Sequence, residues 1–151
     1  MLVRLIEQAD VAAVVRLVRE GYDRFMARDY SAEGAAHFYA YAEALPERMA
    51  SENHLILVAV ADGEAVGVIE MRDCRQCTLF FVSARFHGQG IGRWLFEEAV
   101  AKCRALEPTL DTIIVHSSPY AVPVYKKLGF RNTDTLQEAE GTVYQPMARK
   151  L

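Results

Sequence analysis

The sequence lacks the features that mark secreted, membrane-spanning or strongly nucleic-acid-binding proteins. Its three cysteines cannot all pair within the chain, which argues for reduced thiols rather than a disulfide framework. The longest apolar runs, such as 55–61, fall far short of the roughly 20 residues that cross a bilayer. A net charge of −3 argues against broad electrostatic binding to nucleic acid. We therefore expect a cytoplasmic protein with no membrane and no nucleic-acid partner.

The chain also lacks internal repeats, low-complexity segments and a recognisable linker. Met1 is followed at once by a predicted strand at 2–6, so no signal peptide is expected. A length of 151 residues, with 52% hydrophobic residues, suffices for one hydrophobic core. We predict a single domain over residues 1–151.

A complete metal site is absent as well. Cys74 and Cys77 form a C-x-x-C pair, but no second cysteine or histidine pair at metal spacing completes a zinc site. No helix start follows Cys74 to lower its pKa. We expect no metal and reduced cysteines, with a metal or redox pair as the alternative.

The most informative feature present is the stretch H-G-Q-G-I-G at 87–92. An apolar strand candidate at 78–82 runs into it, and an amphipathic helix candidate starting at Ile91 runs out of it. Glycines let the backbone turn where a side chain would clash. Their N–H groups can then point outward at a helix start, which is a favourable site for phosphate.

Two familiar phosphate motifs do not fit this stretch. A dinucleotide fingerprint needs glycine where Arg93 stands, and the arginine would keep the helix from packing closely on the strand. A nucleotide-triphosphate loop needs Gly-Lys followed by Ser or Thr, but Gly92 is followed by Arg93 and Trp94. A glycine-rich turn that binds nothing remains the other alternative.

The rest of the chain predicts a mixed α/β (α+β) sheet flanked by about four helices. Apolar periodicity and the caps Asp10 and Ser31 predict helices at 10–22 and 31–46. Asp62-Gly63 predicts a hairpin between two strands. The strands are expected at 2–6, 55–61, 65–71, 77–82, 111–116, 130–135 and 143–148. Because strand, helix and strand follow one another from 78 to 116, that strand pair should be parallel within a mostly antiparallel sheet.

A second constellation lies at 118–130. Ser118-Pro119 is a typical helix start, with a hydroxyl cap and proline at the first helical position, and Gly129 is a typical stop. Tyr125 falls on the inward face of this predicted helix. A tyrosine there either satisfies its hydroxyl within the core or lies at the edge of a cavity.

Together these residues resemble the GNAT superfamily of N-acetyltransferases, and the resemblance covers about Val3 to Ala148. The glycine segment is similar to the acetyl-CoA motif Q/R-x-x-G-x-G/A. The later segment is similar to the motif N-x-x-A-x-x-x-Y-x-K-x-G-F. The matching positions are His87, Gly90 and Gly92 in the first motif and Ser118, Ala121, Tyr125, Lys127, Gly129 and Phe130 in the second. His87 replaces the usual Gln or Arg, and Ser118 replaces the usual Asn.

The resemblance implies an acetyl-CoA-dependent N-acetyltransferase that acetylates a primary amine of a small molecule or peptide in a ternary complex. A non-catalytic acyl-CoA sensor is the alternative, and a homodimer is the family expectation. Two neighbouring strands should splay apart to admit the ligand. The implied coenzyme-binding residues are Phe80, Phe81, Val82, His87, Gly88, Gln89, Gly90, Ile91, Gly92, Arg93, Ser118, Ala121 and Tyr125.

The chemistry needs an acid for the departing thiolate and a base for the amine. The resemblance assigns the acid to Tyr125. Two residues are candidates for the base: Glu70, late in an otherwise apolar strand, and His116, at the carboxyl end of its strand. Glu70 could instead form a salt bridge to Arg72, and His116 could instead bond an adjacent loop. The acceptor pocket should draw on an aromatic set: Tyr22, Phe25, Phe38, Tyr39, Tyr41 and Tyr144.

Overall fold

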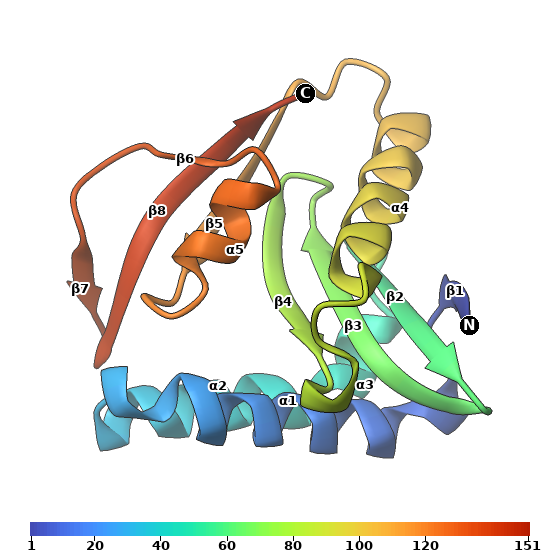
Figure 1. The fold of residues 1–151 in the computed structure, drawn as a ribbon, viewed down its shortest axis with the longest axis horizontal. Coiled ribbons are helices and arrows are strands. Elements are labelled where there is room, and N and C mark those ends of the chain that lie inside the picture. Colours follow the sequence, from blue (N-terminus) through green and yellow to red (C-terminus); the bar gives the residue numbers. More distant parts are fainter.

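The computed structural model describes residues 1–151 and places an eight-stranded sheet at the centre of the molecule (Figure 1). The strand order is β1-β2-β3-β4-β5-β8-β6, with β7 paired to β8 off this path. The strands are β1 (Leu2–Leu5), β2 (His54–Ala61), β3 (Glu64–Arg72), β4 (Gln76–Val82), β5 (Thr112–Ser117), β6 (Arg131–Asn132), β7 (Gln137–Ala139) and β8 (Thr142–Lys150). The helices are α1 (Val11–Phe25), α2 (Ala32–Glu43), α3 (Leu45–Met49), α4 (Ile91–Leu106) and α5 (Val122–Lys127).

Alternation along the central strands divides the core between the two faces of the sheet. Leu57 and Ile69 belong to the hydrophobic cluster that packs against α4, whereas their neighbours Val58 and Val68 belong to the cluster under α1 and α2. Successive strand residues point to opposite faces, so one hairpin supplies both clusters. In Figure 1, α1 and α2 accordingly run along the bottom of the molecule, and α4 stands above them.

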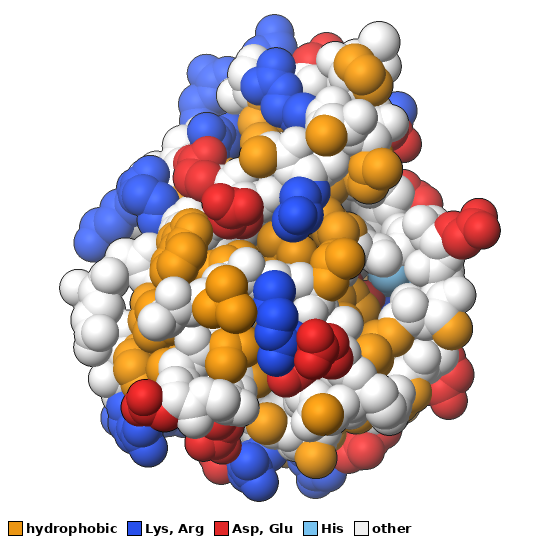
Figure 2. All heavy atoms as spheres, turned by 90° about the vertical axis from the view of Figure 1, so that its right-hand side faces the viewer, with side chains coloured by type: hydrophobic (Ala, Val, Ile, Leu, Met, Phe, Trp, Pro, Cys, Tyr) orange, Lys and Arg blue, Asp and Glu red, His pale blue; other side chains and the backbone are white.

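The β2–β3 hairpin forms as predicted. Its turn places Asp62 at φ 51° and Gly63 at φ 79°, the left-handed conformation that a tight Asp-Gly hairpin requires. The face of the molecule at the right of Figure 1 carries charged side chains of both signs among apolar ones (Figure 2). None of the helices is long and apolar enough to cross a bilayer.

The parallel pair that the βαβ pattern predicts is confirmed, and it is very short. β4 and β5 pair only at Gln76↔Ile114 and Cys77↔Val115. Beyond Cys77, β4 continues against β3 as far as Val82, while β5 continues against β8. The two strands therefore lead to different helices, α4 and α5, and the far part of β4 has no strand on its β5 side.

The N-terminal cap of α1 differs from the prediction. Asp10 has helical backbone angles, because a 3₁₀ turn at 8–10 leads straight into α1, and its side chain caps no α1 amide. Its carboxylate accepts hydrogen bonds from Arg4 at 2.7 and 3.1 Å and from the Glu7 N–H at 2.8 Å. The cap of α2 is confirmed, since the Ser31 hydroxyl accepts from the Gly34 N–H at 3.2 Å. α2 ends at Glu43, and Pro46 lies in the first turn of α3, which begins at Leu45. The structure therefore has five helices where about four were expected.

The start of α5 is also later than predicted. Ser118 accepts a hydrogen bond from the Ala121 N–H at 3.3 Å, but it thereby caps a turn, and the helix begins at Val122. Pro123 lies in the first helical turn, where its missing N–H leaves no bond unmade. Proline at 123 rather than at 119 therefore marks the helix start. The strand β7 was not predicted.

Candidate active site

The glycine segment forms a bare loop at the N-terminus of α4. Gly88 and Gly90 have φ values of 77° and 81°, a region that favours glycine, and a Cβ built at either position would meet nothing within 4 Å. The N–H groups from Gly88 through Arg93 make no backbone hydrogen bond within the chain. Free amides at a helix N-terminus, together with the helix dipole, form an anion site.

Two side chains of the loop hold it in place instead of reaching outward. The Nε2 atom of His87 lies 2.7 Å from the carbonyl oxygen of Val82, at the end of β4. Arg93 donates from Nη2 to the carbonyl oxygen of Lys127 at 2.8 Å, which ties the first turn of α4 to the end of α5. The replacement at 87 therefore links the loop to its strand, and the anion-binding capacity rests on backbone amides.

A cavity of about 410 Å³ opens between the loop, the splayed strands and α5. It joins most of the residues that the resemblance implies for coenzyme binding; Gln89 and Arg93 do not line it. The predicted residues on its wall are Phe80, Phe81, Val82, His87, Gly88, Gly90, Ile91, Gly92, Ser118, Ala121 and Tyr125, together with His116. β4 has an unpaired edge here, so its backbone groups are available to a ligand that enters the gap.

Tyr125 is 7% exposed, and its ring packs between Phe80 and Phe130 at centroid distances of 6.0 and 5.3 Å. Its hydroxyl oxygen lies 4.0 Å from the sulfur of Cys77. Burial raises the pKa of Tyr125 well above its usual value, and the neighbouring thiol adds to this shift. The hydroxyl therefore keeps its proton and can donate it to an anion that forms in the cavity.

Cys77 was expected to be a reduced cysteine, and the structure gives it a specific place. It closes the parallel pairing of β4 with β5, and its thiol lies on the cavity wall. Burial raises the pKa of Cys77 to about 12, so the thiol stays neutral and is a poor nucleophile. Cys74, Cys77 and Cys103 are all free, and no group of three His, Cys, Asp or Glu side chains gathers at a metal spacing.

His116 lies on β5 one residue beyond the last parallel pair, at the start of the splay. Its ring stacks on Tyr144 of β8 at 4.6 Å between centroids. Desolvation, with a smaller contribution from Arg72, lowers the pKa of His116 below its usual value. A neutral imidazole that opens onto a cavity is suited to accept a proton near neutral pH.

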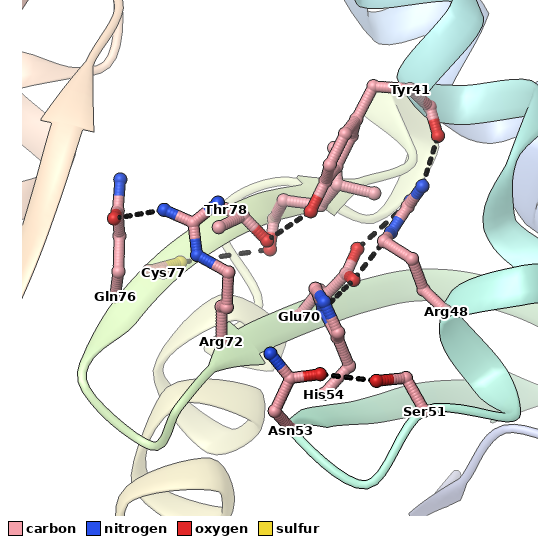
Figure 3. A network of polar contacts seen from close by, with 11 residues as sticks. Tyr41, Arg48, Ser51, Asn53, His54, Glu70, Arg72, Gln76, Cys77 and Thr78 are labelled. Carbon is pink, nitrogen blue, oxygen red and sulfur yellow. Dashed lines mark hydrogen bonds and ion pairs between the residues drawn. The ribbon is translucent and has the colours of Figure 1, made fainter.

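Glu70 lies in a buried ion-pair network on the opposite side of β3 from α4 (Figure 3). The carboxylate is fully buried and accepts from Arg48 at 2.7 and 3.1 Å. The Nδ1 atom of His54 lies 2.7 Å from the same carboxylate but out of hydrogen-bond alignment. Arg72 donates to Gln76 instead, at 2.6 Å, so the expected pairing of Glu70 with Arg72 does not form. Glu70 lines neither cavity described here.

Tyr41 connects the Glu70–Arg48 ion pair to the wall of the cavities. The Arg48 guanidinium donates to the Tyr41 carbonyl oxygen and lies 3.6 Å from the centre of the Tyr41 ring. The Tyr41 hydroxyl donates to the Thr78 hydroxyl at 2.9 Å, as Figure 3 shows. Glu70 and Arg48 therefore fix the position of Tyr41, which in turn orients Thr78 on the wall.

A second cavity of about 240 Å³ adjoins the first. The two share Tyr30, Phe38, Cys77, Thr78 and His116 in their walls. The second cavity is open to solvent and is bounded on one side by residues of α2 and by Thr142, at the start of β8. α2 and the β7–β8 turn meet so closely that a Cβ on Gly34 would lie 2.3 Å from the carbonyl oxygen of Gly141.

Only part of the predicted aromatic set lines these cavities. Phe25, Phe38 and Tyr41 do, whereas Tyr22 is 1% exposed in the core, Tyr39 donates to Asp23, and Tyr144 stacks behind His116. Tyr30 and Tyr120 on the cavity walls were missed. Tyr120 lies between Ser118 and Tyr125 in sequence, and this position could have indicated that it faces the cavity. Its ring stacks on Phe25 at 4.6 Å between centroids. Tyr30 precedes the Ser31 cap and carried no signal.

Comparison with known proteins places this architecture in a family. The family model described as an acetyltransferase (GNAT) domain matches residues 26–151. A search of curated proteins finds no match.

Solved structures share the fold over nearly the whole chain. The PaiA N-acetyltransferase from Thermoplasma acidophilum, in complex with coenzyme A, has a TM-score of 0.83 at 19% identity, covering 99% of this chain and 98% of that one. A GCN5-related N-acetyltransferase from Rhodopseudomonas palustris has a TM-score of 0.81 at 19% identity, with coverages of 99% and 95%. The ribosomal-protein-alanine N-acetyltransferase from Brucella melitensis has a TM-score of 0.73 at 20% identity and full coverage of both chains. With its family match over most of its length, this chain belongs to the GNAT acetyltransferases and is an acyltransferase.

Proposed function

We propose that this acyltransferase transfers the acetyl group of acetyl-CoA to a primary amine of a small molecule or peptide, by direct attack within a ternary complex. The observation that carries the proposal is the set of unbonded amides from Gly88 through Arg93, at the mouth of the gap between β4 and β5. A diphosphate at these amides would place its attached pantetheine arm along the free edge of β4.

The residues of the cavity fit such a ligand. The loop amides supply donors for a diphosphate, and the unpaired edge of β4 supplies hydrogen bonds for amide groups of an extended chain. Apolar walls, including Phe80 and Val82, suit the methylenes between them. When bound, acetyl-CoA would supply a thioester whose acyl group is activated for transfer.

Tyr125 and His116 are the proposed proton-transfer residues. Tyr125 holds a proton at Oη within the cavity, where a thiolate leaves. His116 stands where the two cavities meet, and it accepts the proton that the attacking amine must lose. The geometry favours His116 over Glu70 as the base, because the Glu70 carboxylate is engaged by Arg48 and faces neither cavity.

A comparison of two ligands tests the coenzyme site. Calorimetric titration should compare CoA with pantetheine, which lacks the diphosphate and the adenosine 3′-phosphate attached to it. Pantetheine should bind at least about a hundredfold more weakly, since each hydrogen bond to a charged group is worth roughly 1.5–3 kcal/mol. Equal affinities would show that the glycine loop is not a diphosphate site. Thiol release from acetyl-CoA that depends on added amine then tests the transfer itself.

A further inference from the structure

Resting on the proposed function, we infer the acceptor class from the second cavity: a monoamine whose remaining body is uncharged and carries an aromatic ring. The acceptor must reach His116 from the side away from the coenzyme loop. The second cavity meets that requirement, because it contains His116 and Thr78 but none of the loop glycines.

The walls of both cavities carry no Asp, Glu, Lys or Arg side chain. The carboxylates on the surrounding elements lie outside both walls. Among them, Glu138 and Glu140 on the β7–β8 segment are exposed and make no ion pair, and the buried Oδ2 atom of Asp29 accepts no hydrogen bond. Glu70 is held by Arg48, the exposed Glu33 lies 3.8 Å from His37, and Asp29 lies 4.0 Å from Arg28. A second ammonium held against these walls would therefore give up part of its hydration without a counter-charge in contact, and so would a carboxylate.

The reacting ammonium avoids this free-energy cost, because it loses its charge in the reaction. On arrival it can lie beside the Tyr30 and Phe38 rings, which line both cavities, and aromatic rings attract a cation. It then gives its proton to the neutral imidazole of His116, and the resulting amine attacks the acyl carbon as the carbon–sulfur bond breaks. The proton on Tyr125 goes to the departing sulfur, and the second proton that the nitrogen loses goes back to the Tyr125 oxygen. The proton on His116 then passes to solvent, so charge and protons balance.

The volume and the wall residues of the second cavity indicate the size and polarity of the part of the acceptor beyond its amine. An apolar cavity of about 150 Å³ holds one benzene molecule, so 240 Å³ accommodates a ring with a short chain. Aromatic side chains of α2, Phe38 and Tyr41, offer packing surfaces for a ring. Gln76 and Thr142 provide neutral polar groups, which a ring hydroxyl could meet.

Two matched substrate pairs test the inference. We expect kcat/KM with acetyl-CoA to fall at least about tenfold from 2-phenylethylamine to phenylalanine, which adds only a carboxylate. A similar fall is expected from hexylamine to 1,6-diaminohexane, which adds only a second ammonium. A short peptide with a free N-terminus is the third comparison, and it should react more slowly than 2-phenylethylamine.

A charge introduced on the wall provides the matched variant test. Thr142 lines only the second cavity, and its hydroxyl bonds the Ala139 carbonyl oxygen at 2.8 Å. In Thr142→Glu, the ratio of kcat/KM for hexylamine to kcat/KM for 1,6-diaminohexane should fall at least about fivefold. In Thr142→Gln, whose new side chain has the size of glutamate but no charge, the same ratio should stay unchanged.

The outcomes separate this inference from the proposed function. If CoA binds but the diamine, the amino acid or the peptide reacts as well as the aromatic monoamine, or no monoamine reacts, the acceptor class is wrong and the coenzyme site stands. If CoA and pantetheine bind equally or not at all, the proposed function fails first.

Discussion

Replacing Tyr125 by phenylalanine should remove the acid while leaving the coenzyme site intact. The substitution deletes one oxygen whose nearest polar neighbour is the Cys77 sulfur at 4.0 Å, a weak contact. The ring keeps its packing against Phe80 and Phe130. The change in unfolding free energy should therefore stay below about 1 kcal/mol. General acid catalysis contributes about 10²–10⁴-fold, so kcat should fall by that factor.

The assay follows thiol release from acetyl-CoA with an amine, beside calorimetric titration of CoA into the same variant. Tyr120→Phe is the matched control. Tyr120 lines the same cavity and is 41% exposed, and its hydroxyl has no partner within the chain. The control should keep both kcat and CoA affinity. An unchanged kcat in the Tyr125 variant, or an equal loss in both variants, would refute the acid role.

Three other perturbations follow from the structure. Gly90→Ala, at φ 81° with open space for its Cβ, should lower the free energy of unfolding by about 1–2 kcal/mol and weaken CoA binding about tenfold, because the loop amides shift. Gly63→Ala, at φ 79°, is the control: it should lower the free energy of unfolding in urea by a similar amount and leave CoA binding unchanged. The pKa of His116 is lowered and its neutral ring is the active form, so kcat/KM should rise with pH through a pKa below 6.5. In His116→Gln this rise of kcat/KM with pH should disappear, and a pH profile that still shows it would contradict the role of His116 as the base. Glu70→Gln should lower the free energy of unfolding in urea by about 3–5 kcal/mol, because Arg48 is left buried without a counter-charge. The double variant Arg48→Met with Glu70→Met should recover most of the lost stability. A Glu70→Gln variant as stable as the parent would refute the argument.

Much of the fold followed from local patterns in the sequence. The Asp62-Gly63 turn, the Ser31 cap and the strand–loop–helix around Gly88 depend on residues close together in the chain, and each forms as predicted. The parallel pairing of β4 with β5 also followed, because two strands joined by one crossover helix pair in parallel when they are neighbours in a sheet. Most residues that the family motifs pointed to line one cavity, since both motifs flank the same pair of strands.

Local patterns failed where a side chain took a partner other than the one its position in the pattern suggested. Asp10 reads as a helix cap, but Arg4 and the preceding turn take its carboxylate. Glu70 reads as a base or a partner of Arg72, but α3 brings Arg48 to it across the sheet. The Asp10 outcome depends on the local turn at 8–10, whereas the Glu70 outcome depends on which helix packs over β3 and is not encoded in spacing.

The sequence by itself determined the order of elements, the bare-amide loop and the tyrosine beside it, since these depend on backbone freedom and short-range periodicity. Only the tertiary structure decided which groups share a cavity. Close packing of α2 on the β7–β8 turn, with Gly34 against Gly141, forms one side of the second cavity beside His116. The approach of α3 to the sheet buries Glu70 with Arg48, so neither charge lies on the walls that remain for a substrate.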